Sequence, residues 1–424
     1  MNYFVIFLFL YLGYLAYCKM PTCFPLILIT YVLLGSFMLG SISPYSIFSV
    51  FVSMIFFIKY KNAAGLIKKF PFRYMFLVFI FSLTLTNFGV SHQYRHTPTL
   101  VFNICQSAIY AYCIWFLLKK YPHQTLTSLL KISLWFGLLI SLYVLYETVT
   151  KTNPLLRFLV ESGYYIQSAF ITEIRFGFKR AQAIFSMHTT LGGVMLFVYA
   201  LLLVAYKTKF IHQNRRNVLI IFLCALSVFL TGARSCIIAV FVSSLMWLSH
   251  IKGKQIFIIL CMMLPVLSLF AGDYLQQIID SISNTETVNG SNSDMRLTQL
   301  LISWSYLMHS PIWGNGIGFL YNDVVLMNLD PDLYGAESLW FGVMADQGCV
   351  GIVAYALLFI SPMIYSWKRN NKSAAFFVLA TFIMFSLSSI PGVNPAMIPI
   401  FTIIINMMMD KSKEAKINSS LIIQ

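Results

Sequence analysis

Charged residues are scarce in this sequence, and acidic ones are the scarcest. Only 10% of the 424 residues are charged, with 14 Asp and Glu against 29 Lys and Arg, whereas 59% are hydrophobic. A soluble globular protein carries about 25% charged residues. The composition therefore excludes a soluble globular domain and indicates an integral membrane protein.

The sequence also lacks the motifs that bind nucleotides, metal ions or disulfide partners. It has no phosphate-binding GxxxxGK[ST] segment, no dinucleotide fingerprint and no Asp-rich cluster, so we expect no ATP-driven activity, no cofactor and no metal. The cysteines lie in or beside hydrophobic runs without metal-type spacing, which predicts packing roles rather than a disulfide framework. They are Cys18, Cys23, Cys105, Cys113, Cys224, Cys236, Cys261 and Cys349.

Long hydrophobic runs, by contrast, recur along the whole chain. Runs of about 17 to 25 apolar residues cross a hydrocarbon core of about 30 Å as helices. Because lipid offers no hydrogen-bond partners to the backbone, we predict one all-α integral membrane domain over 1–424, with about 11 to 14 transmembrane helices. The first run lacks a basic flank and a small-residue cleavage site, so we expect a retained helix. The predicted spans are 2–18, 24–41, 43–58, 72–90, 98–118, 125–148, 186–206, 217–231, 234–250, 254–270, 338–367, 372–390 and 395–409.

Basic residues alternate between the two sides of this predicted bundle. Twenty of them fall on every second connection, which the positive-inside rule assigns to the cytoplasm and which explains most of the net charge of +15 without nucleic acid. This topology places the N-terminus outside and leaves two long outer loops, 149–185 and 271–337. The twenty residues are Lys19, Lys59, Lys61, Lys68, Lys69, Arg73, Lys119, Lys120, Lys207, Lys209, Arg215, Arg216, Lys252, Lys254, Lys368, Arg369, Lys372, Lys411, Lys413 and Lys416.

The few basic residues on the outer side are candidates for binding an anion. Arg234 follows Thr231-Gly-Ala at the start of a predicted helix, where free backbone N–H groups also favour a phosphate. Snorkelling of a boundary arginine is the alternative. Arg175, Lys179 and Arg180 form a second outer group, for which anchoring at the membrane interface is the alternative.

The large outer loop 271–337 contains a single basic residue, Arg296, among eight acidic ones. Apolar residues at helical spacing predict an amphipathic helix over 295–308 that lies on the membrane surface. Arg296 in its first turn could bind a lipid phosphate or diphosphate through two N–H groups. Pairing with Asp294 or another neighbouring carboxylate is the alternative.

Glu337 lies at the outer mouth of the predicted helix 338–367. A carboxylate at this boundary is costly unless it is paired or used, and it could accept a proton from a hydroxyl group. Helix capping together with Ser338 is the structural alternative. Asp346, about two turns deeper, could pair with Gln347 or another helix, or extend a polar cleft.

A glycine-rich segment, His309-Ser-Pro-Ile-Trp-Gly-Asn-Gly-Ile-Gly318, follows the predicted amphipathic helix. Three glycines at alternate positions permit tight turns and the close approach of a ligand to backbone amides. A flexible connector is an equally good interpretation of the spacing. His309 is more typical of a helix end than of a catalyst.

Four segments around the large outer loop resemble the O-antigen polymerase and ligase superfamily, over about 180–355. They are Arg180-Ala-Gln-Ala-Ile-Phe185 before Gly192-Gly193, Thr231-Gly-Ala-Arg-Ser235, His309 to Gly318, and Glu337-Ser338 followed nine residues later by Gly348-Cys-Val-Gly351. Ligases of this superfamily carry histidine where this chain has Glu337. The departure looks like the polymerase branch.

The resemblance implies a multi-pass protein of the bacterial inner membrane whose active site faces the periplasm, with 149–185 and 271–337 as periplasmic loops. It implies Glu337 as the acid/base, Arg234 and Arg296 as diphosphate-binding residues and Arg180 as a further arginine for the lipid-linked glycan. The implied partners are undecaprenyl-diphosphate-linked oligosaccharide, membrane lipids and a chain-length-regulating co-polymerase, but no nucleic acid.

The implied reaction polymerises O-antigen repeat units by glycosyl transfer that needs no metal and no nucleotide sugar. Two alternatives stay open: an O-antigen ligase, and a flippase for the same lipid-linked sugar. Transporters concentrate polar residues near the bilayer midplane, whereas this chain concentrates them in an outer loop and at helix ends. The distribution favours an enzyme.

Overall fold

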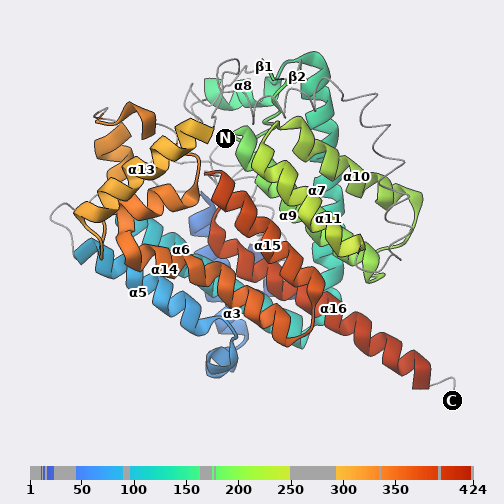
Figure 1. Ribbon diagram of the computed structural model, residues 1–424. Coiled ribbons are helices and arrows are strands. Elements are labelled where there is room, and N and C mark those ends of the chain that lie inside the picture. The colour runs from blue at the N-terminus through green and yellow to red at the C-terminus, as the bar shows by residue number, and fades with distance from the viewer. Residues whose placement is uncertain are drawn as a thin grey trace.

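The computed structural model describes residues 44–88, 96–162, 174–175, 178–248, 293–325, 329–333, 336–389 and 393–421, with Met327 and a few positions within 11–22. These residues form a bundle of helices, which confirms the predicted all-α class (Figure 1). The predicted spans 24–41 and 254–270 lie outside the described residues, as does most of 2–18.

The long helices match the other ten predicted spans to within a few residues at both ends, except that α16 continues twelve residues beyond the predicted end at 409. They are α3 (Pro44–Lys59), α5 (Arg73–Phe88), α6 (His96–Lys120), α7 (Pro122–Thr150), α9 (His188–Lys207), α10 (Arg215–Leu230), α11 (Arg234–Leu248), α14 (Leu339–Lys368), α15 (Lys372–Leu387) and α16 (Ile398–Leu421).

Shorter elements connect these helices. The helical ones are α4 (Ala63–Leu66), η1 (Ile67–Lys69), α8 (Pro154–Glu161), α13 (Ser293–His309), the π-turn η3 (Leu320–Val325), η4 (Pro331–Leu333) and η5 (Pro395–Met397). Two short antiparallel strands, β1 (Ile174–Arg175) and β2 (Phe178–Lys179), place Ile174 opposite Lys179. The predicted amphipathic helix 295–308 corresponds to α13.

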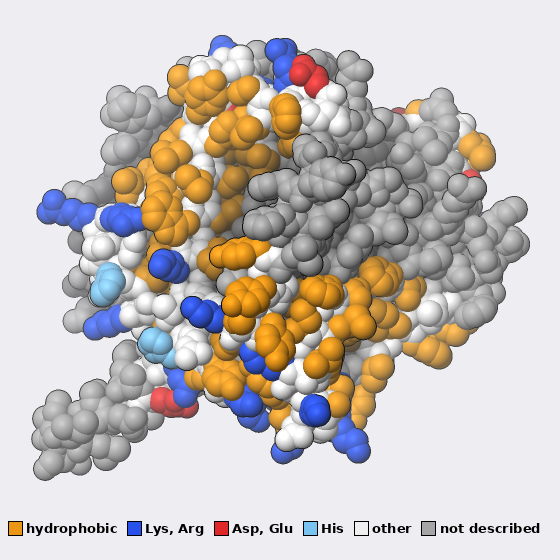
Figure 2. Space-filling view, turned by 180° about the vertical axis from the view of Figure 1, so that it is seen from behind, with side chains coloured by type: hydrophobic (Ala, Val, Ile, Leu, Met, Phe, Trp, Pro, Cys, Tyr) orange, Lys and Arg blue, Asp and Glu red, His pale blue; other side chains and the backbone are white. Residues whose placement is uncertain are grey.

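Three of the described helices are long and apolar enough to cross a membrane, namely α7, α9 and α14. A fourth crossing results if 50–59 and 63–69, which meet at a bend of 98°, count as one broken span. Three shorter apolar helices lie within 73–86, 234–246 and 372–387. Large hydrophobic side chains on the outside of the bundle, such as Phe222 and Trp367, suit contact with lipid (Figure 2).

Lysine gathers at one end of the bundle, which we call the basic end. Lys59, Lys207 and Lys368 lie in the last turns of their helices, as do both lysines that end α6. The last turns of α5, α7, α10 and α15, which run the opposite way, contain no basic residue. We call the opposite end, where α11 and α14 begin, the loop end. The asymmetry follows the positive-inside pattern of the sequence.

Helix α9 forms the centre of one half of the bundle. Of its most apolar 18-residue stretch, 89% is buried, because α7, α10, α11 and α16 pack around it. Gly192 permits this packing: a Cβ there would lie 2.9 Å from Cys236 Sγ on α11. Small residues at helix contacts let membrane helices approach closely. Figure 1 shows α15 and α16 between this half and the half that contains α5 and α14.

Candidate functional site

Arg296 and Glu337 form an ion pair at the loop end of the bundle. The Nη2 and Nε groups of Arg296, on α13, donate to Glu337 Oε2 over 2.9 and 3.1 Å. The side chains are 34% and 29% exposed, so the pair is partly buried. Residues 41 positions apart in the sequence are thereby brought into direct contact.

Gln299 fixes the backbone at Glu337. Its buried side-chain oxygen accepts the Glu337 N–H over 3.1 Å, and its amide nitrogen donates to the carbonyl of Asp332 over 3.2 Å. Arg296 and Gln299 are three residues apart on α13 and therefore share one face of the helix. That face holds both the backbone and the carboxylate of Glu337.

Ser338, not Glu337, caps α14. The Ser338 hydroxyl accepts the Trp340 N–H over 3.2 Å, and the first helical residue is Leu339. Glu337 thus precedes the cap and lies outside the first turn, so the capping interpretation holds for Ser338 alone. The carboxylate of Glu337 is instead used in the pair with Arg296.

The glycine-rich segment locks into a break in α14. Gly348 has φ 61° and ψ −156°, which interrupts the helix. The amides of Cys349 and Val350 donate to the carbonyls of Pro311 and Ile312 over 2.9 and 3.2 Å. The loop thereby supplies hydrogen bonds that the interrupted helix has lost, which an irregular backbone at membrane depth requires.

Asp346 completes this junction. Its two carboxylate oxygens accept the N–H groups of Gly318 and Leu320 over 2.9 and 2.8 Å, so its partners are loop amides rather than Gln347. The Asn315 side chain donates to the Ala345 carbonyl over 2.9 Å. These hydrogen bonds hold residues 311–320 in the break of α14, and we call this segment the glycine plug. The interpretation as a flexible connector is wrong, because its glycines serve close contact between backbones.

Arg180 is buried against the turn that precedes Arg234. Its Nε donates to the Thr231 carbonyl over 3.1 Å and its Nη2 to the Gly232 carbonyl over 3.4 Å. Gly232 has φ +64°, a conformation that glycine adopts readily. Only 7% of Arg180 is exposed, so anchoring at the membrane interface does not hold for it. The structure brings Arg180 to the turn between α10 and α11.

A second ion pair, which the sequence analysis missed, is fully buried beside Arg180. Lys179 Nζ lies 3.1 Å from Glu147 Oε1, with side chains 2% and 0% exposed. Glu147 is the single acidic residue in the predicted span 125–148. An ionisable residue inside a hydrophobic span is rare and costly, and that signal identifies the position.

The two arginine groups lie at the same end of the bundle on different helices. Arg180 and Arg234 are at the α10–α11 turn, whereas Arg296 and Glu337 are at the α13–α14 junction. Helix α15 packs against both α11 and α14 and lies between them (Figure 1). The four predicted site residues thus fall into two groups of two, one at the α10–α11 turn and one at the α13–α14 junction.

A hollow of about 360 Å³ lies at the other end of α13. It is lined by Ser305, Tyr306, His309, Asn315 and Phe319. The Tyr306 hydroxyl donates to Asp330, and burial together with this carboxylate raises the pKa of Tyr306 to about 12. The phenol therefore stays protonated at neutral pH and acts as a donor.

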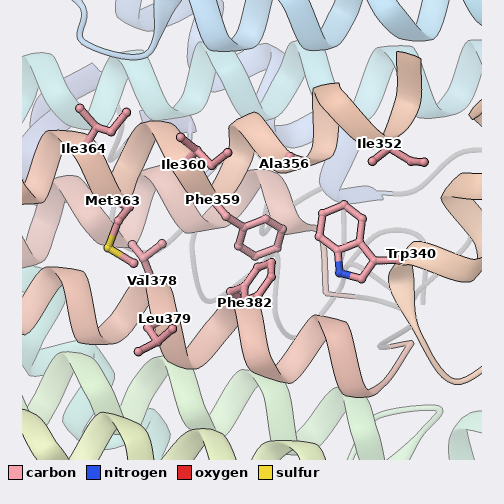
Figure 3. A pocket seen from close by; sticks show the side chains of 10 residues that line it. All are labelled: Trp340, Ile352, Ala356, Phe359, Ile360, Met363, Ile364, Val378, Leu379 and Phe382. Atoms are coloured by element: carbon pink, nitrogen blue, oxygen red, sulfur yellow. The ribbon is translucent and has the colours of Figure 1, made fainter. Parts of the chain in front are cut away.

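An apolar groove of about 490 Å³ runs between α14 and α15, and only hydrophobic side chains line it (Figure 3). It begins at Trp340, three residues after Glu337, and continues past Phe359 and Phe382 to Ile364. The Trp340 indole donates to Ser386 over 2.9 Å, which fixes the ring at this end of the groove.

Residues 219–356 match the family model described as O-antigen ligase. The match supports the O-antigen polymerase and ligase superfamily. It contains Arg234, Arg296 and Glu337 and the glycine plug, whereas Arg180 and Glu147 lie before it. The family points to a glycosyl-transfer type of enzyme in the O-antigen pathway of lipopolysaccharide biosynthesis. No curated protein matches the chain.

Proposed function

We propose that the protein is an O-antigen polymerase that joins undecaprenyl-diphosphate-linked repeat units at the periplasmic face of the bacterial inner membrane. The observation that carries the proposal is the contact of Arg296 with Glu337. It joins a group suited to a diphosphate to a group suited to a sugar hydroxyl, at the end of the bundle opposite the lysines. The O-antigen ligase family match over this segment supports the same chemistry.

In the proposed reaction, a hydroxyl at the non-reducing end of one lipid-linked repeat unit attacks the anomeric carbon of a lipid-linked chain. The new bond joins the hydroxyl oxygen to that carbon. The bond from the carbon to the diphosphate oxygen breaks, and its electron pair leaves with undecaprenyl diphosphate. The hydroxyl proton passes to the carboxylate of Glu337, which acts as the general base.

The geometry of the pair leaves atoms available for both tasks. Both hydrogen bonds from Arg296 end on Oε2 of Glu337, so Oε1 can accept the proton. The second terminal nitrogen of Arg296, Nη1, can donate to a diphosphate oxygen. Charge that develops on the leaving diphosphate is then stabilised by an arginine that also positions the base.

Arg234 is proposed as the second diphosphate ligand, and Arg180 as its support. Arg234 begins α11, and the N-terminus of a helix favours an anion. The guanidinium of Arg180 is occupied by the carbonyls of Thr231 and Gly232. We therefore assign Arg180 to the position of the turn rather than to direct contact with glycan.

The apolar groove between α14 and α15 is proposed to hold the isoprenoid tail of a lipid-linked substrate. It contains hydrophobic side chains only, and it starts three residues from the proposed base. A substrate that placed its diphosphate at Arg296 would lay its tail along α14, within the hydrocarbon layer. Because the surrounding lipid is as apolar as the groove, prenyl units bound there would be held by close packing against its side chains.

An O-antigen ligase is the second candidate, because the matching family model carries that description. Ligases that the sequence resembles have histidine at the position of Glu337, which favours the polymerase here. A flippase for the lipid-linked repeat unit is the third candidate.

The lipopolysaccharide banding pattern of a deletion strain tests the proposal. We expect core that carries a single repeat unit, and restoration of the ladder by the wild-type gene. Bare core would contradict the polymerase, and long polymer accumulating on undecaprenyl diphosphate would then identify a ligase. Complementation with Glu337→Gln should leave the single-unit pattern, whereas Glu414→Gln, an exposed carboxylate at the basic end, should restore the full ladder.

A further inference from the structure

The carboxylate of Glu147 organises the segment that leads into Arg180. One oxygen pairs with Lys179 Nζ at 3.1 Å, and the other accepts the N–H groups of Gln182 and Ala183 over 3.1 and 2.7 Å. Ala183 has φ +51°, which is unfavourable for a residue with a side chain. The segment is thus held in a strained turn by one buried side chain of α7.

Asn153, near the start of the outer connection 149–185, also fixes this segment. Its buried amide donates to the Ala183 carbonyl over 2.7 Å, and its side-chain oxygen accepts the N–H of Leu156 and caps α8. The Tyr143 hydroxyl donates to that oxygen over 2.8 Å. Helices α7 and α8 therefore converge on the turn at 183.

Residues 180 and 181 are hydrogen-bonded in turn to the backbone of the α10–α11 turn. The N–H of Ala181 donates to the Leu230 carbonyl over 3.1 Å, and Arg180 donates to the next two carbonyls along the chain, those of Thr231 and Gly232. Three successive residues, 179 to 181, thus connect Glu147 to the backbone that immediately precedes Arg234.

A buried ion pair is a poor means of stabilising a protein. The cost of removing both charges from water offsets their attraction, and a well-packed hydrophobic pair is often as stable or more so. Removing one partner alone, however, leaves an uncompensated buried charge and is strongly destabilising. The pair between Glu147 and Lys179 is therefore better explained by the geometry it imposes than by stability.

We propose that Glu147 and Lys179 are positioning residues that set the α10–α11 turn, with Arg234 and the N-terminus of α11, for the diphosphate of a lipid-linked substrate. This inference rests on the proposed function, since it concerns the same reaction. The pair acts through Arg180, which contacts the carbonyls of the α10–α11 turn. It has no direct contact with the reacting atoms in the proposed scheme.

The test is a double variant, Glu147→Leu with Lys179→Met, in purified protein in lipid nanodiscs. It removes both buried charges at once and so avoids an unpaired one. We expect wild-type helical content, a lower thermal unfolding temperature because the amides of Gln182 and Ala183 lose their acceptor, and an affinity for undecaprenyl diphosphate weakened about tenfold or more. Binding of undecaprenyl monophosphate serves as the reference, and the preference for the diphosphate should fall. In turnover, KM for the donor should rise more than kcat falls.

The matched control is Asn371→Leu with Asn406→Leu at the basic end, where a buried polar pair is also replaced by hydrophobic residues. We expect it to keep the wild-type preference for the diphosphate. A folded Glu147→Leu/Lys179→Met variant with wild-type affinity and KM would overturn the inference. If that double variant does not fold, Glu147→Gln with Lys179→Met serves instead, because glutamine keeps an oxygen for the amides of Gln182 and Ala183: unchanged diphosphate preference in that folded variant would overturn the inference, and a reduced one would support it.

Failure of the proposed function gives a different result. In that case the deletion strain would show bare core or an unchanged lipopolysaccharide ladder, or the wild-type protein itself would show no preference for undecaprenyl diphosphate. A wild-type protein that binds the diphosphate and a double variant that binds it equally well would contradict only the positioning role.

Discussion

Gly314 and Gly348 lie backbone against backbone. A Cβ added at Gly348 would be 2.6 Å from the Gly314 nitrogen, and one added at Gly314 would be 2.4 Å from the Gln347 nitrogen. Both residues also have positive φ. This contact joins the loop 311–320 to the break in α14 and so fixes the direction in which the first part of α14 leads to Glu337.

Replacing either glycine by alanine should destabilise the protein. The strained backbone conformation costs about 1–3 kcal/mol for a residue with a side chain, and overlap with backbone atoms adds to this. We expect Gly348→Ala and Gly314→Ala to lower the thermal unfolding temperature in detergent. Gly342→Ala is the control on the same helix, since its Cβ would make an ordinary 3.6 Å contact with Leu320. Equal unfolding temperatures for all three variants would contradict the close contact.

Asp346→Asn should loosen the plug without removing its bulk. The carboxylate accepts two amides through its two oxygens, whereas the asparagine side chain offers one oxygen and a competing donor. Leaving one buried amide without an acceptor costs about 1–3 kcal/mol. We expect faster hydrogen exchange in the peptides that contain Gly318 and Leu320, with unchanged exchange in α9. Unchanged protection of those peptides would show that the two bonds do not hold the plug.

The sequence predicts the helices well because their signal is local. Each hydrophobic run is long enough to define a helix by itself, and the lysines at alternate connections define its direction. Ser338 as a cap follows from the same local rules. Nine of the ten spans that the structure describes therefore begin and end within a few residues of their predicted positions, and α16 alone continues well beyond its predicted end.

Contacts between distant segments could not be predicted in this way. The pairing of Arg296 with Glu337 depends on how α13 packs against α14, and nothing in the spacing of either residue specifies it. The backbone contact between Gly314 and Gly348 likewise depends on the break in α14, whereas the hydrophobic pattern predicts one continuous span there. Glu147 carried a usable signal, because it is an acidic residue inside a hydrophobic run.

The ion pair of Arg296 with Glu337 can be separated from its proposed chemistry by exchanging the two residues. Arg296→Glu with Glu337→Arg restores opposite charges, but it moves the proposed base onto α13 and the diphosphate ligand onto the mouth of α14. We expect protein of normal abundance and fold, assayed by thermal unfolding, and a lipopolysaccharide pattern with a single repeat unit. A full ladder in the exchanged variant would indicate that the pair has a structural role only.

Arg296→Lys is a smaller change that tests the two hydrogen bonds from Arg296 to Glu337. Lysine keeps the charge, but it lacks the planar guanidinium. Arginine can donate to Glu337 through Nε and Nη2 while a further N–H group faces a phosphate. We expect partial activity, seen as a shorter ladder, and a loss of about tenfold or more in donor affinity. Wild-type ladder length would show that charge alone suffices at this position.

Filling the apolar groove should impair the use of long-chain substrates. Ala356 lies on its floor beside Phe359 and Ile360, and a tryptophan at this position would occupy space between α14 and α15 (Figure 3). We expect Ala356→Trp to raise KM for undecaprenyl-linked donor about tenfold, while a donor with a short prenyl chain is used as by wild type. Val353→Trp is the control, because Val353 is exposed on the same helix and does not line the groove. An equal effect on both chain lengths would argue that the tail binds elsewhere, since a groove that holds the tail discriminates by its length.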